Sequence, residues 1–135
     1  MNNRVPEPKL GLMANVLDER GKLVSLEFSG HAMKRFYYIK ADPHSGKRGN
    51  HAHKILYQIL FSLHGTWNVR LTRQGESKDY QLLEDSNYLL IPAGYWRVFE
   101  SLNENAILGV IASEVYDESD YIRNFQEFEE WEKNN

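Results

Sequence analysis

The chain is 135 residues long with a formal net charge of −3 and no cysteine, which predicts one domain, residues 1–135, and excludes disulfides and thiol chemistry. The mild acidity gives no electrostatic reason to expect nucleic acid or an anionic membrane as a partner, and the lack of cysteine fits a reducing cytoplasm. The first eight residues lack the apolar core of a secretory signal, and no apolar stretch approaches the roughly 20 residues of a membrane span, so we expect a cytoplasmic protein.

Short stretches in which apolar and polar residues alternate fill most of the chain, and this is the pattern of strands with one buried face. Turn-forming residues separate them, at 18–21, 42–46, 64–65, 74–77, 92–94 and 103–105. The predicted strands, in chain order, are 11–17, 22–28, 34–40, 51–54, 57–64, 66–73, 78–84, 87–91, 96–101 and 106–113. Many short strands at even spacing are typical of an antiparallel sandwich or small barrel, so we expect an all-β fold.

Only the C-terminal end has a helical pattern. Tyr121, Phe125, Phe128 and Trp131 recur at helical spacing among glutamates. We therefore predict one short α-helix over about 121–133, which docks through its apolar stripe on a barrel formed by about 11–115.

His51 and His53 are the most informative residues for function. A strand projects alternate side chains to one face, so a His-x-His pair places two imidazoles side by side. Two neighbouring imidazoles can ligate a metal or transfer protons near neutral pH. Two ordinary half-buried histidines fit this short pattern equally well, so the surrounding residues must decide.

The residues around the pair follow the spacing of two cupin motifs. The first motif has His-x-His, a glutamate about five residues later and then a glycine, and it aligns with His51, His53, position 58 and Gly65. The second motif, Pro-x-Gly with a histidine three residues after the glycine, aligns with Pro92-Ala93-Gly94. The chain therefore resembles the cupins, which implies a double-stranded β-helix, or jelly-roll, barrel.

Two departures from these motifs argue against a metal. Gln58 stands where the motif has its glutamate, and Arg97 stands where it has its last histidine. A neutral amide is a poorer ligand than a carboxylate, and a permanently charged guanidinium would repel a cation. The sequence thus predicts a cupin without metal or other cofactor, which leaves proton transfer to His51 and His53.

Four arginines suggest an anionic ligand. They are Arg20 in a turn, Arg35 in strand 34–40, Arg48 just before the histidines and Arg123 near the barrel-to-helix junction. In strand 34–40, Arg35 and Tyr37 share one face, and Tyr38 lies on the other. Each arginine alone would be a solvated surface charge, but several at one barrel mouth would suit a pyrophosphate, which guanidinium groups bind bidentately.

Over about residues 14–130 the chain resembles the sugar-nucleotide 3,4-ketoisomerases of the cupin superfamily, which act on dTDP-4-keto-6-deoxyglucose. Two runs carry most of the resemblance. They are Arg48-Gly49-Asn50-His51-Ala52-His53-Lys54 followed by Gln58, and Tyr116-Asp117-Glu118-Ser119-Asp120-Tyr121-Ile122-Arg123. Further matches lie at 18–23, 34–39, 92–93 and 112–115.

The resemblance implies a metal-independent isomerase that moves a ketone from C4 to C3 of the hexose, in the biosynthesis of 3-amino-3,6-dideoxy sugars for surface glycans. It also implies a homodimer with exchanged N-terminal strands. The residues that fit the family's site are His51, His53, Tyr37 and Arg20 for catalysis, and Arg35, Arg48, Gln58, Arg123 and Tyr38 for substrate binding.

The residue types suit this reaction, which needs a base beside the ring, a proton carrier between O3 and O4, and a positive group for the enediolate. An imidazole can accept and return a proton at neutral pH, so we assign His51 as the principal base and His53 as its partner or proton shuttle. Tyr37 would handle oxygen protons or orient the sugar, and Arg20 would stabilise the enediolate. The order of the two histidines stays open, as does the configuration at C4 of the product.

Three other functions stay open. A cupin 3,5-epimerase would also abstract a proton beside the ketone of the same sugar nucleotide. A cupin without catalytic activity would only bind the nucleotide sugar. A metal-dependent cupin oxygenase would require a cation despite Gln58 and Arg97.

Overall fold

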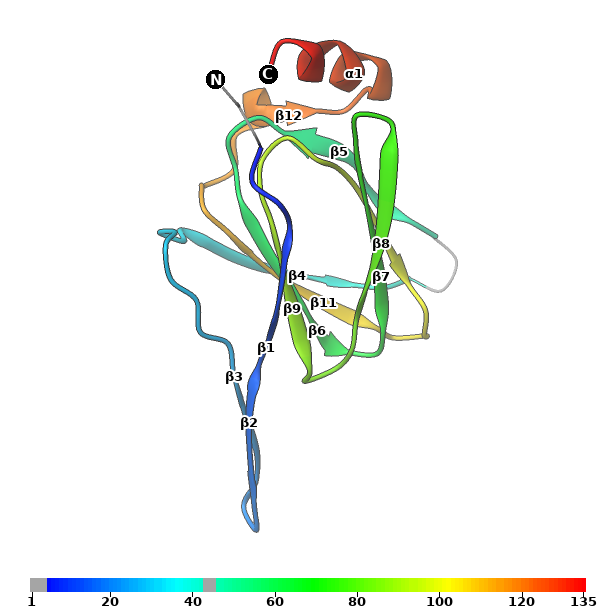
Figure 1. The fold of residues 1–135 in the computed structure, drawn as a ribbon. Coiled ribbons are helices and arrows are strands. Elements are labelled where there is room, and N and C mark those ends of the chain that lie inside the picture. Colours follow the sequence, from blue (N-terminus) through cyan, green and yellow to red (C-terminus); the bar gives the residue numbers. More distant parts are fainter. Residues whose placement is uncertain (1–4, 43–45) are drawn as a thin grey trace.

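The computed structural model describes residues 5–42 and 46–135. Two five-stranded antiparallel sheets face each other, a two-stranded hairpin projects from them, and one α-helix follows at the C-terminal end (Figure 1). The predicted all-β jelly-roll barrel with a C-terminal helix is therefore confirmed. Residues 1–4 of the N-terminal segment and residues 43–45 of the predicted turn at 42–46 lie outside the described residues.

The strands of the two sheets come from both halves of the chain. The first sheet has the order β1 (Lys9–Leu12), β9 (Asn87–Ile91), β6 (Gln58–His64), β11 (Ile107–Ala112) and β4 (Arg35–Lys40). The second has the order β12 (Tyr121–Ile122), β5 (Arg48–His53), β10 (Trp96–Ser101), β7 (Trp67–Arg73) and β8 (Glu76–Leu82). This order puts β4 at the edge of one sheet, while β5, followed only by the short β12, lies near the edge of the other.

The core between the sheets follows from the alternation of side chains along each strand. In β7, Trp67, Val69 and Leu71 are buried and Arg70 is exposed. Strands of both sheets contribute the other fully buried apolar residues, which include Leu60, Leu82, Leu89, Ile91, Leu108 and Val110. Burial of these side chains provides the main driving force for packing one sheet on the other.

The N-terminal strand is divided where one strand was predicted. Residues 11–17 belong to β1 and to β2 (Ala14–Asp18), which lie on either side of the buried Met13. β1 pairs with β9, whereas β2 pairs only with β3 (Gly21–Ser25). The resulting hairpin extends away from the barrel (Figure 1).

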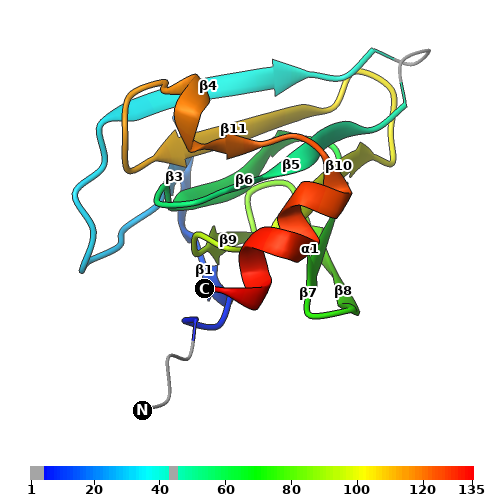
Figure 2. The ribbon, with the colours of Figure 1, turned by 90° about the horizontal axis from the view of Figure 1, so that it is seen from above.

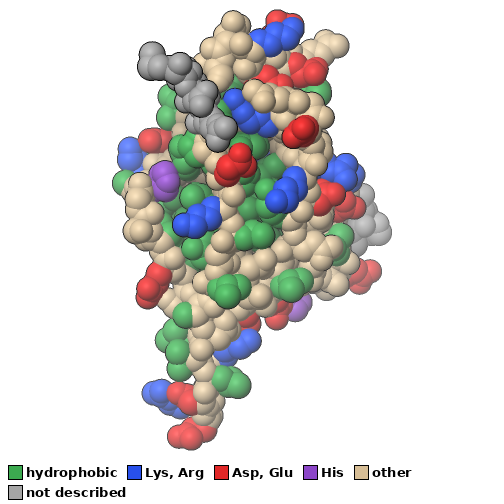
Figure 3. Space-filling view, in the orientation of Figure 1, with side chains coloured by type: hydrophobic (Ala, Val, Ile, Leu, Met, Phe, Trp, Pro, Cys, Tyr) green, Lys and Arg blue, Asp and Glu red, His purple; other side chains and the backbone are tan. Residues whose placement is uncertain are grey.

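The hairpin exposes apolar side chains along its length. Leu17 is 76% exposed and Leu23 is 61% exposed, and Val16 is also exposed. Figure 3 shows this apolar stretch together with the charged residues at its tip. A hairpin with such a surface has no core of its own.

The C-terminal helix is shorter than predicted. α1 spans Phe125–Lys133, and its N-cap is Asn124, whose side chain accepts a hydrogen bond from the backbone N–H of Glu127 (3.0 Å). Tyr121–Ile122 is a strand instead, because it pairs with β5 and buries Ile122. Phe128 is fully buried and anchors α1 beside β5 and β10 (Figure 2).

Candidate active site

A bulge in β5 prepares the histidine pair. Arg97 of β10 pairs with His51 and Val98 pairs with Gly49, so Asn50 is an extra residue between two regular pairs. Gly49 (φ 93°) and Asn50 (φ 55°) both have positive φ. A Cβ on Gly49 would lie 2.7 Å from the backbone oxygen of Arg97, so only glycine fits this position without a shift.

The bulge directs the carbonyl of Gly49 towards the ring of His51, whose Nδ1 lies 3.0 Å from that oxygen. Because a carbonyl only accepts hydrogen bonds, Nδ1 carries the proton and Nε2 of the neutral ring has a free lone pair. Nε2 of His51 is buried and has no hydrogen-bond partner among the described residues. His51 is therefore held as a neutral base.

His53 follows the same rule with another partner. Its Nδ1 lies 3.1 Å from Oδ2 of Asp120, and its buried Nε2 also lacks a partner among the described residues. The two imidazoles meet edge to face with centroids 4.9 Å apart, as expected for alternate positions of one strand. Asp120 belongs to a short 3₁₀ helix, η1 (Glu118–Asp120), directly before β12.

Burial and nearby cations keep both rings uncharged. Removal from water and the Arg97 guanidinium lower the pKa of His51 to about 4, and the same two causes hold the pKa of His53 even further below its usual range. At neutral pH both histidines are thus free bases.

A cavity of about 970 Å³ opens between β4 and β5, and His51 lines it. His53 is fully buried and is not among the lining residues. The lining includes four basic residues, Arg35, Arg48, Arg123 and, on the outward face of β4 with Tyr38, Lys40, and no carboxylate among the described residues. An anion is the ligand that such a cavity would attract.

A chain of buried hydrogen bonds positions Tyr37 in the same cavity. Arg97 is fully buried and donates from Nη1 to Oε1 of Gln58 (2.8 Å), and Nε2 of Gln58 donates to the hydroxyl of Tyr37 (3.1 Å). Burial raises the pKa of Tyr37, so the phenol keeps its proton. Because its oxygen already accepts from Gln58, its own O–H remains able to donate to a ligand.

The residues in the metal-ligand positions do not fit a metal. Gln58 and Arg97 contact each other directly, and burial lowers the pKa of Arg97 only to about 10, so the guanidinium is charged at neutral pH. Within residues 5–42 and 46–135, no group of three or more His, Asp or Glu side chains could hold a metal ion.

Arg123 lies at the other side of the cavity, on the ring of Tyr121. Its guanidinium is 4.2 Å from the ring centroid, and it forms an ion pair with Glu118 (2.6 Å). The ring of Tyr121 lies 4.4 Å from that of His53 and 4.9 Å from that of His51. The ring of Tyr121 therefore contacts both the guanidinium of Arg123 and the rings of the two histidines.

Two predicted site residues do not point into this cavity. Arg20 lies at the turn of the β2–β3 hairpin, where its side chain is 86% exposed and forms an ion pair with Asp18 (2.7 Å). Tyr38 lies at the rim, but strand alternation turns its ring outwards, beside Phe36 (centroids 6.4 Å apart). Arg35, Tyr37, Arg48 and Arg123 do line the cavity, and Gln58 lies behind it.

The comparison with known proteins agrees with this geometry. The family model described as FdtA (WxcM-like, C-terminal) matches residues 7–133. The chain belongs to this family. A curated relative, the TDP-4-oxo-6-deoxy-α-D-glucose-3,4-oxoisomerase of Aneurinibacillus thermoaerophilus, is 31% identical over 128 residues, which are 93% of this chain and 92% of the relative.

Solved structures of 3,4-ketoisomerases have the same fold. QdtA from Thermoanaerobacterium thermosaccharolyticum in complex with TDP is 33% identical, with a TM-score of 0.84 over 94% of this chain and 95% of that one. A 3,4-ketoisomerase from Helicobacter canadensis is 32% identical, with a TM-score of 0.87 over 94% and 98%. The site thus lies in a fold that is shared along almost the whole chain.

Sequence reasoning gave no site role to Asp120, Tyr121 or Arg97. Asp120 and Tyr121 belong to the late run that resembles the ketoisomerases. Only the pairing of Tyr121 with His53 shows that this run closes over the histidines. Arg97 was noted only as a departure from the metal motif, whereas it is the buried donor that holds Gln58.

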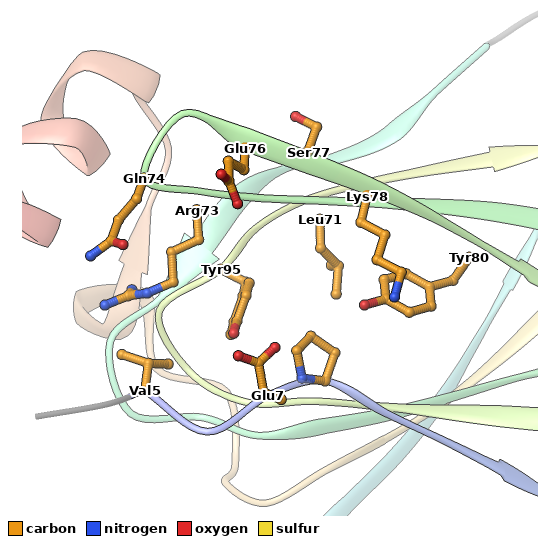
Figure 4. A pocket seen from close by; sticks show the side chains of 11 residues that line it. Val5, Glu7, Leu71, Arg73, Gln74, Glu76, Ser77, Lys78, Tyr80 and Tyr95 are labelled. Atoms are coloured by element: carbon orange, nitrogen blue, oxygen red, sulfur yellow. The ribbon is translucent and has the colours of Figure 1, made fainter. Parts of the chain in front are cut away.

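A second cavity, of about 560 Å³, lies between the segment before β1 and the β7–β8 hairpin (Figure 4). Its polar side chains include Glu7, Arg73, Glu76 and Lys78. Arg73 donates to the carbonyl of Gly94 (2.7 Å), and the guanidinium lies 5.8 Å from the ring centroid of Tyr95. No histidine lines this cavity among the described residues.

Proposed function

We propose that this protein is a metal-independent 3,4-ketoisomerase that converts dTDP-4-keto-6-deoxy-D-glucose to the dTDP-3-keto-6-deoxyhexose. The observation that carries the proposal is the neutral His51, whose lone pair has no partner among the described residues, at the wall of a cavity whose lining includes Arg35, Arg48 and Arg123. The relatives support the substrate, since one is named as an oxoisomerase of this sugar nucleotide and another has been solved with TDP-4-keto-6-deoxyglucose.

In this proposal His51 removes the proton from C3, which is acidic because it lies next to the C4 carbonyl. The C3–H electron pair then forms the C3–C4 double bond, and the electron pair of the C4 carbonyl moves to O4, which carries the negative charge while O3 keeps its proton. The proton of the O3 hydroxyl moves to O4, and protonation of C4 leaves the ketone at C3. No proton or electron is gained or lost overall.

Tyr37 is the proposed carrier of the proton between the two oxygens. Its O–H is free to donate, while Gln58 and Arg97 fix the phenol from behind. Gln58, which we expected to bind substrate, would act through Tyr37 because it is fully buried. His53 would support His51 from behind rather than contact the sugar, since it too is fully buried.

The arginines would bind the pyrophosphate. Arg35, Arg48 and Arg123 all line the cavity, and guanidinium groups match phosphate oxygens bidentately. Glu118 holds Arg123 in the ligand-free protein, and a phosphate could replace that carboxylate. This exchange costs little because the ion pair is half exposed.

We further propose a homodimer with exchanged N-terminal strands, in which Arg20 reaches the cavity of the second copy. The apolar surface of the hairpin supports this assembly, because the exposure of Leu17 and Leu23 to water costs free energy that a second copy would recover. The exposed rings of Phe36 and Tyr38 offer a second apolar surface on the outer side of β4. Sedimentation of the wild type and of a Leu17→Asp variant would test it, since a monomeric wild type contradicts the dimer.

The isomerase would work in the cytoplasm, on the route to 3-amino-3,6-dideoxy sugars of surface glycans. Within the described residues, no helix is long and apolar enough to cross a membrane. Nucleotide sugars are the activated form in which such hexoses would be supplied and aminated at the new C3 ketone.

NMR spectroscopy of the product formed from dTDP-4-keto-6-deoxyglucose in deuterated water tests the activity directly. An isomerase gives a 3-keto product with deuterium at C4, and the coupling constants show whether the C4 hydroxyl is axial or equatorial. Exchange at C3 and C5 with the 4-keto group retained would identify a 3,5-epimerase. Tight binding without any turnover, unchanged in His51→Asn, would identify a protein that only binds the sugar nucleotide.

A further inference from the structure

The carboxylate of Asp120 collects several donors at the end of the histidine strand. Oδ2 accepts from Nδ1 of His53 (3.1 Å) and from the backbone N–H of Leu56 (3.3 Å), and Oδ1 accepts from the backbone N–H of Ile55 (2.8 Å). The backbone carbonyl of Asp120 accepts from Lys54 (3.0 Å). Its side chain is only 11% exposed. Both oxygens of this carboxylate are thus engaged on the segment that carries the histidines.

We propose that Asp120 is a positioning residue that fixes His53 in the Nδ1–H tautomer and thereby prepares the pair for proton transfer at His51. The proposal rests on the proposed isomerase function. The role of Asp120 does not depend on which carbon of the sugar His51 deprotonates. It concerns only which ring nitrogens of the two histidines carry protons before substrate binds.

The donors and acceptors at the contact between Asp120 and His53 decide the tautomer. An ionised carboxylate can only accept hydrogen bonds, so the group that faces it must be Nδ1–H of His53. The remaining nitrogen, Nε2, then has a lone pair and no partner among the described residues. With the tautomer reversed, His53 would place a lone pair against the carboxylate and an N–H on the side of His51 and Tyr121.

The charges around the pair give this tautomer a function. The basic groups that lower the pKa of the two histidines are Arg97 on β10, Arg35 on β4 and Arg123 after β12. Arg97 and Arg123 oppose the positive charge that His51 gains when it accepts a proton, and Arg35 opposes a charge on His53. Glu118 acts in the other direction on His51, and among the acidic side chains of the described residues Asp120 is the one that hydrogen-bonds to the pair. Asp120 therefore fixes the ring of His53, which lies edge to face with the ring of His51 on which that charge forms.

Asp120→Asn is the informative variant because the amide nearly keeps the shape of the carboxylate. Its oxygen can still accept from Ile55, and its NH₂ group then faces Nδ1 of His53, which must become an acceptor. We expect kcat to fall about 10- to 100-fold, the range found when a partner that orients a functional histidine is removed. KM should change by less than about 2-fold, because Asp120 does not line the cavity.

Asp117→Asn is the control in the same turn. Asp117 caps η1 by accepting from the backbone N–H and hydroxyl of Ser119 (3.0 and 2.7 Å), and within the described part of the chain no hydrogen bond joins it to a histidine. Its substitution should leave kcat unchanged. An equal loss in both variants would show that the turn is merely structural and would overturn the proposal.

The tautomer itself is measured by ¹⁵N NMR of the histidine rings in the substrate-free wild-type protein. We expect the proton of His53 on Nδ1 in the wild type and on Nε2 in Asp120→Asn. A wild-type His53 protonated at Nε2 would reject the proposal even if the variant failed to fold. A wild type with the Nδ1–H tautomer but without isomerase activity would reject the proposed function and leave the role of Asp120 in the tautomer standing.

Discussion

Two cavities at opposite edges of the sandwich have similar ingredients and different chemistry. Each combines tyrosine rings with basic side chains, but the β4–β5 cavity is lined by four cations without a carboxylate, whereas Glu7 and Glu76 balance Arg73 and Lys78 in the cavity of Figure 4. A net positive lining selects anions, and a balanced lining does not. The balance of charge in the lining therefore distinguishes the two cavities.

The cavities also differ in which polar atoms are satisfied. In the Figure 4 cavity the hydroxyl of Tyr95 donates to the carbonyl of Pro6 (3.1 Å), and Arg73 donates to Gly94. At the β4–β5 cavity, Nε of Arg35 and Nε2 of His51 are buried and have no partner among the described residues. Buried polar atoms without a partner cost free energy, and a site that retains them is arranged for something else to bind. The buried polar atoms without a partner therefore favour the β4–β5 cavity, and not the cavity of Figure 4, as the place where a ligand binds.

The largest expected effect is at His51. His51→Asn should lower kcat by about 10²- to 10⁴-fold, the usual loss for a general base, with little change in KM, because asparagine keeps a polar side chain of similar reach. Steady-state kinetics with dTDP-4-keto-6-deoxyglucose measures this.

His64→Asn is the control for that variant. His64 lies at the end of β6, its side chain is 58% exposed, and it pairs with Glu84. It should keep wild-type kcat. Similar losses of kcat in both variants would show that the effect is not specific to the histidine of the β4–β5 cavity.

The next effect concerns the cations of the β4–β5 cavity. Arg123→Ala and Arg48→Ala should raise KM by about 10- to 100-fold, since a charge-assisted hydrogen bond contributes about 1.5–3 kcal/mol, and kcat should change little because a phosphate clamp acts on ground and transition states alike. A fall in kcat with unchanged KM would place these arginines at the reacting carbons instead.

The sequence was sufficient for the fold and for much of this cavity because both depend on local patterns. The bounds of β9 and β10 were predicted to the residue, since alternation and turn residues fix short strands well. The faces of strand 34–40 also followed from alternation, so Arg35 and Tyr37 were correctly placed on one side. The spacing of His51 and His53 predicted two adjacent rings, and they are adjacent.

The features of the fold and of the site that the sequence did not predict depend on contacts between segments that are distant along the chain. Helical spacing placed Tyr121 in the helix, but its backbone pairs with β5, and the N-cap at Asn124 starts the helix later. Asp120 lies 67 residues from His53 along the chain, so no local pattern could join them. Arg20 was assigned to the site through family resemblance, and within one chain the hairpin holds it away from the histidines (Figure 1).

A smaller effect is expected on stability at acidic pH. The pKa of His51 is about 4 in the folded protein and near its ordinary 6.5 in the unfolded chain, so the unfolded chain binds more protons between these values. The free energy of unfolding should therefore fall as the pH falls from about 6.5 towards 4.

The contribution of His51 is isolated by comparing slopes. Within this window, the dependence of unfolding free energy on pH should be flatter in His51→Asn than in the wild type by up to about 1.4 kcal/mol per pH unit, one proton's worth. Urea denaturation at several pH values measures both slopes. Equal slopes of unfolding free energy against pH in the two proteins would show that His51 is not kept neutral by its surroundings. The β4–β5 cavity would then lack the neutral base that distinguishes it from the cavity of Figure 4.

The smallest effect is expected in the cavity of Figure 4. Lys78 lies over the ring of Tyr80 (5.1 Å to the centroid), so Lys78→Ala removes a cation that is comparable in charge to Arg48 but lies at the other edge. Because the lining loses its balance of charge without losing a catalytic group, kcat and KM should both stay within about 2-fold of wild type, as for substitutions outside the functional features. If Lys78→Ala raised KM as strongly as Arg48→Ala, the substrate would extend to both edges of the sandwich, and neither charge balance nor unsatisfied atoms would suffice to locate the site.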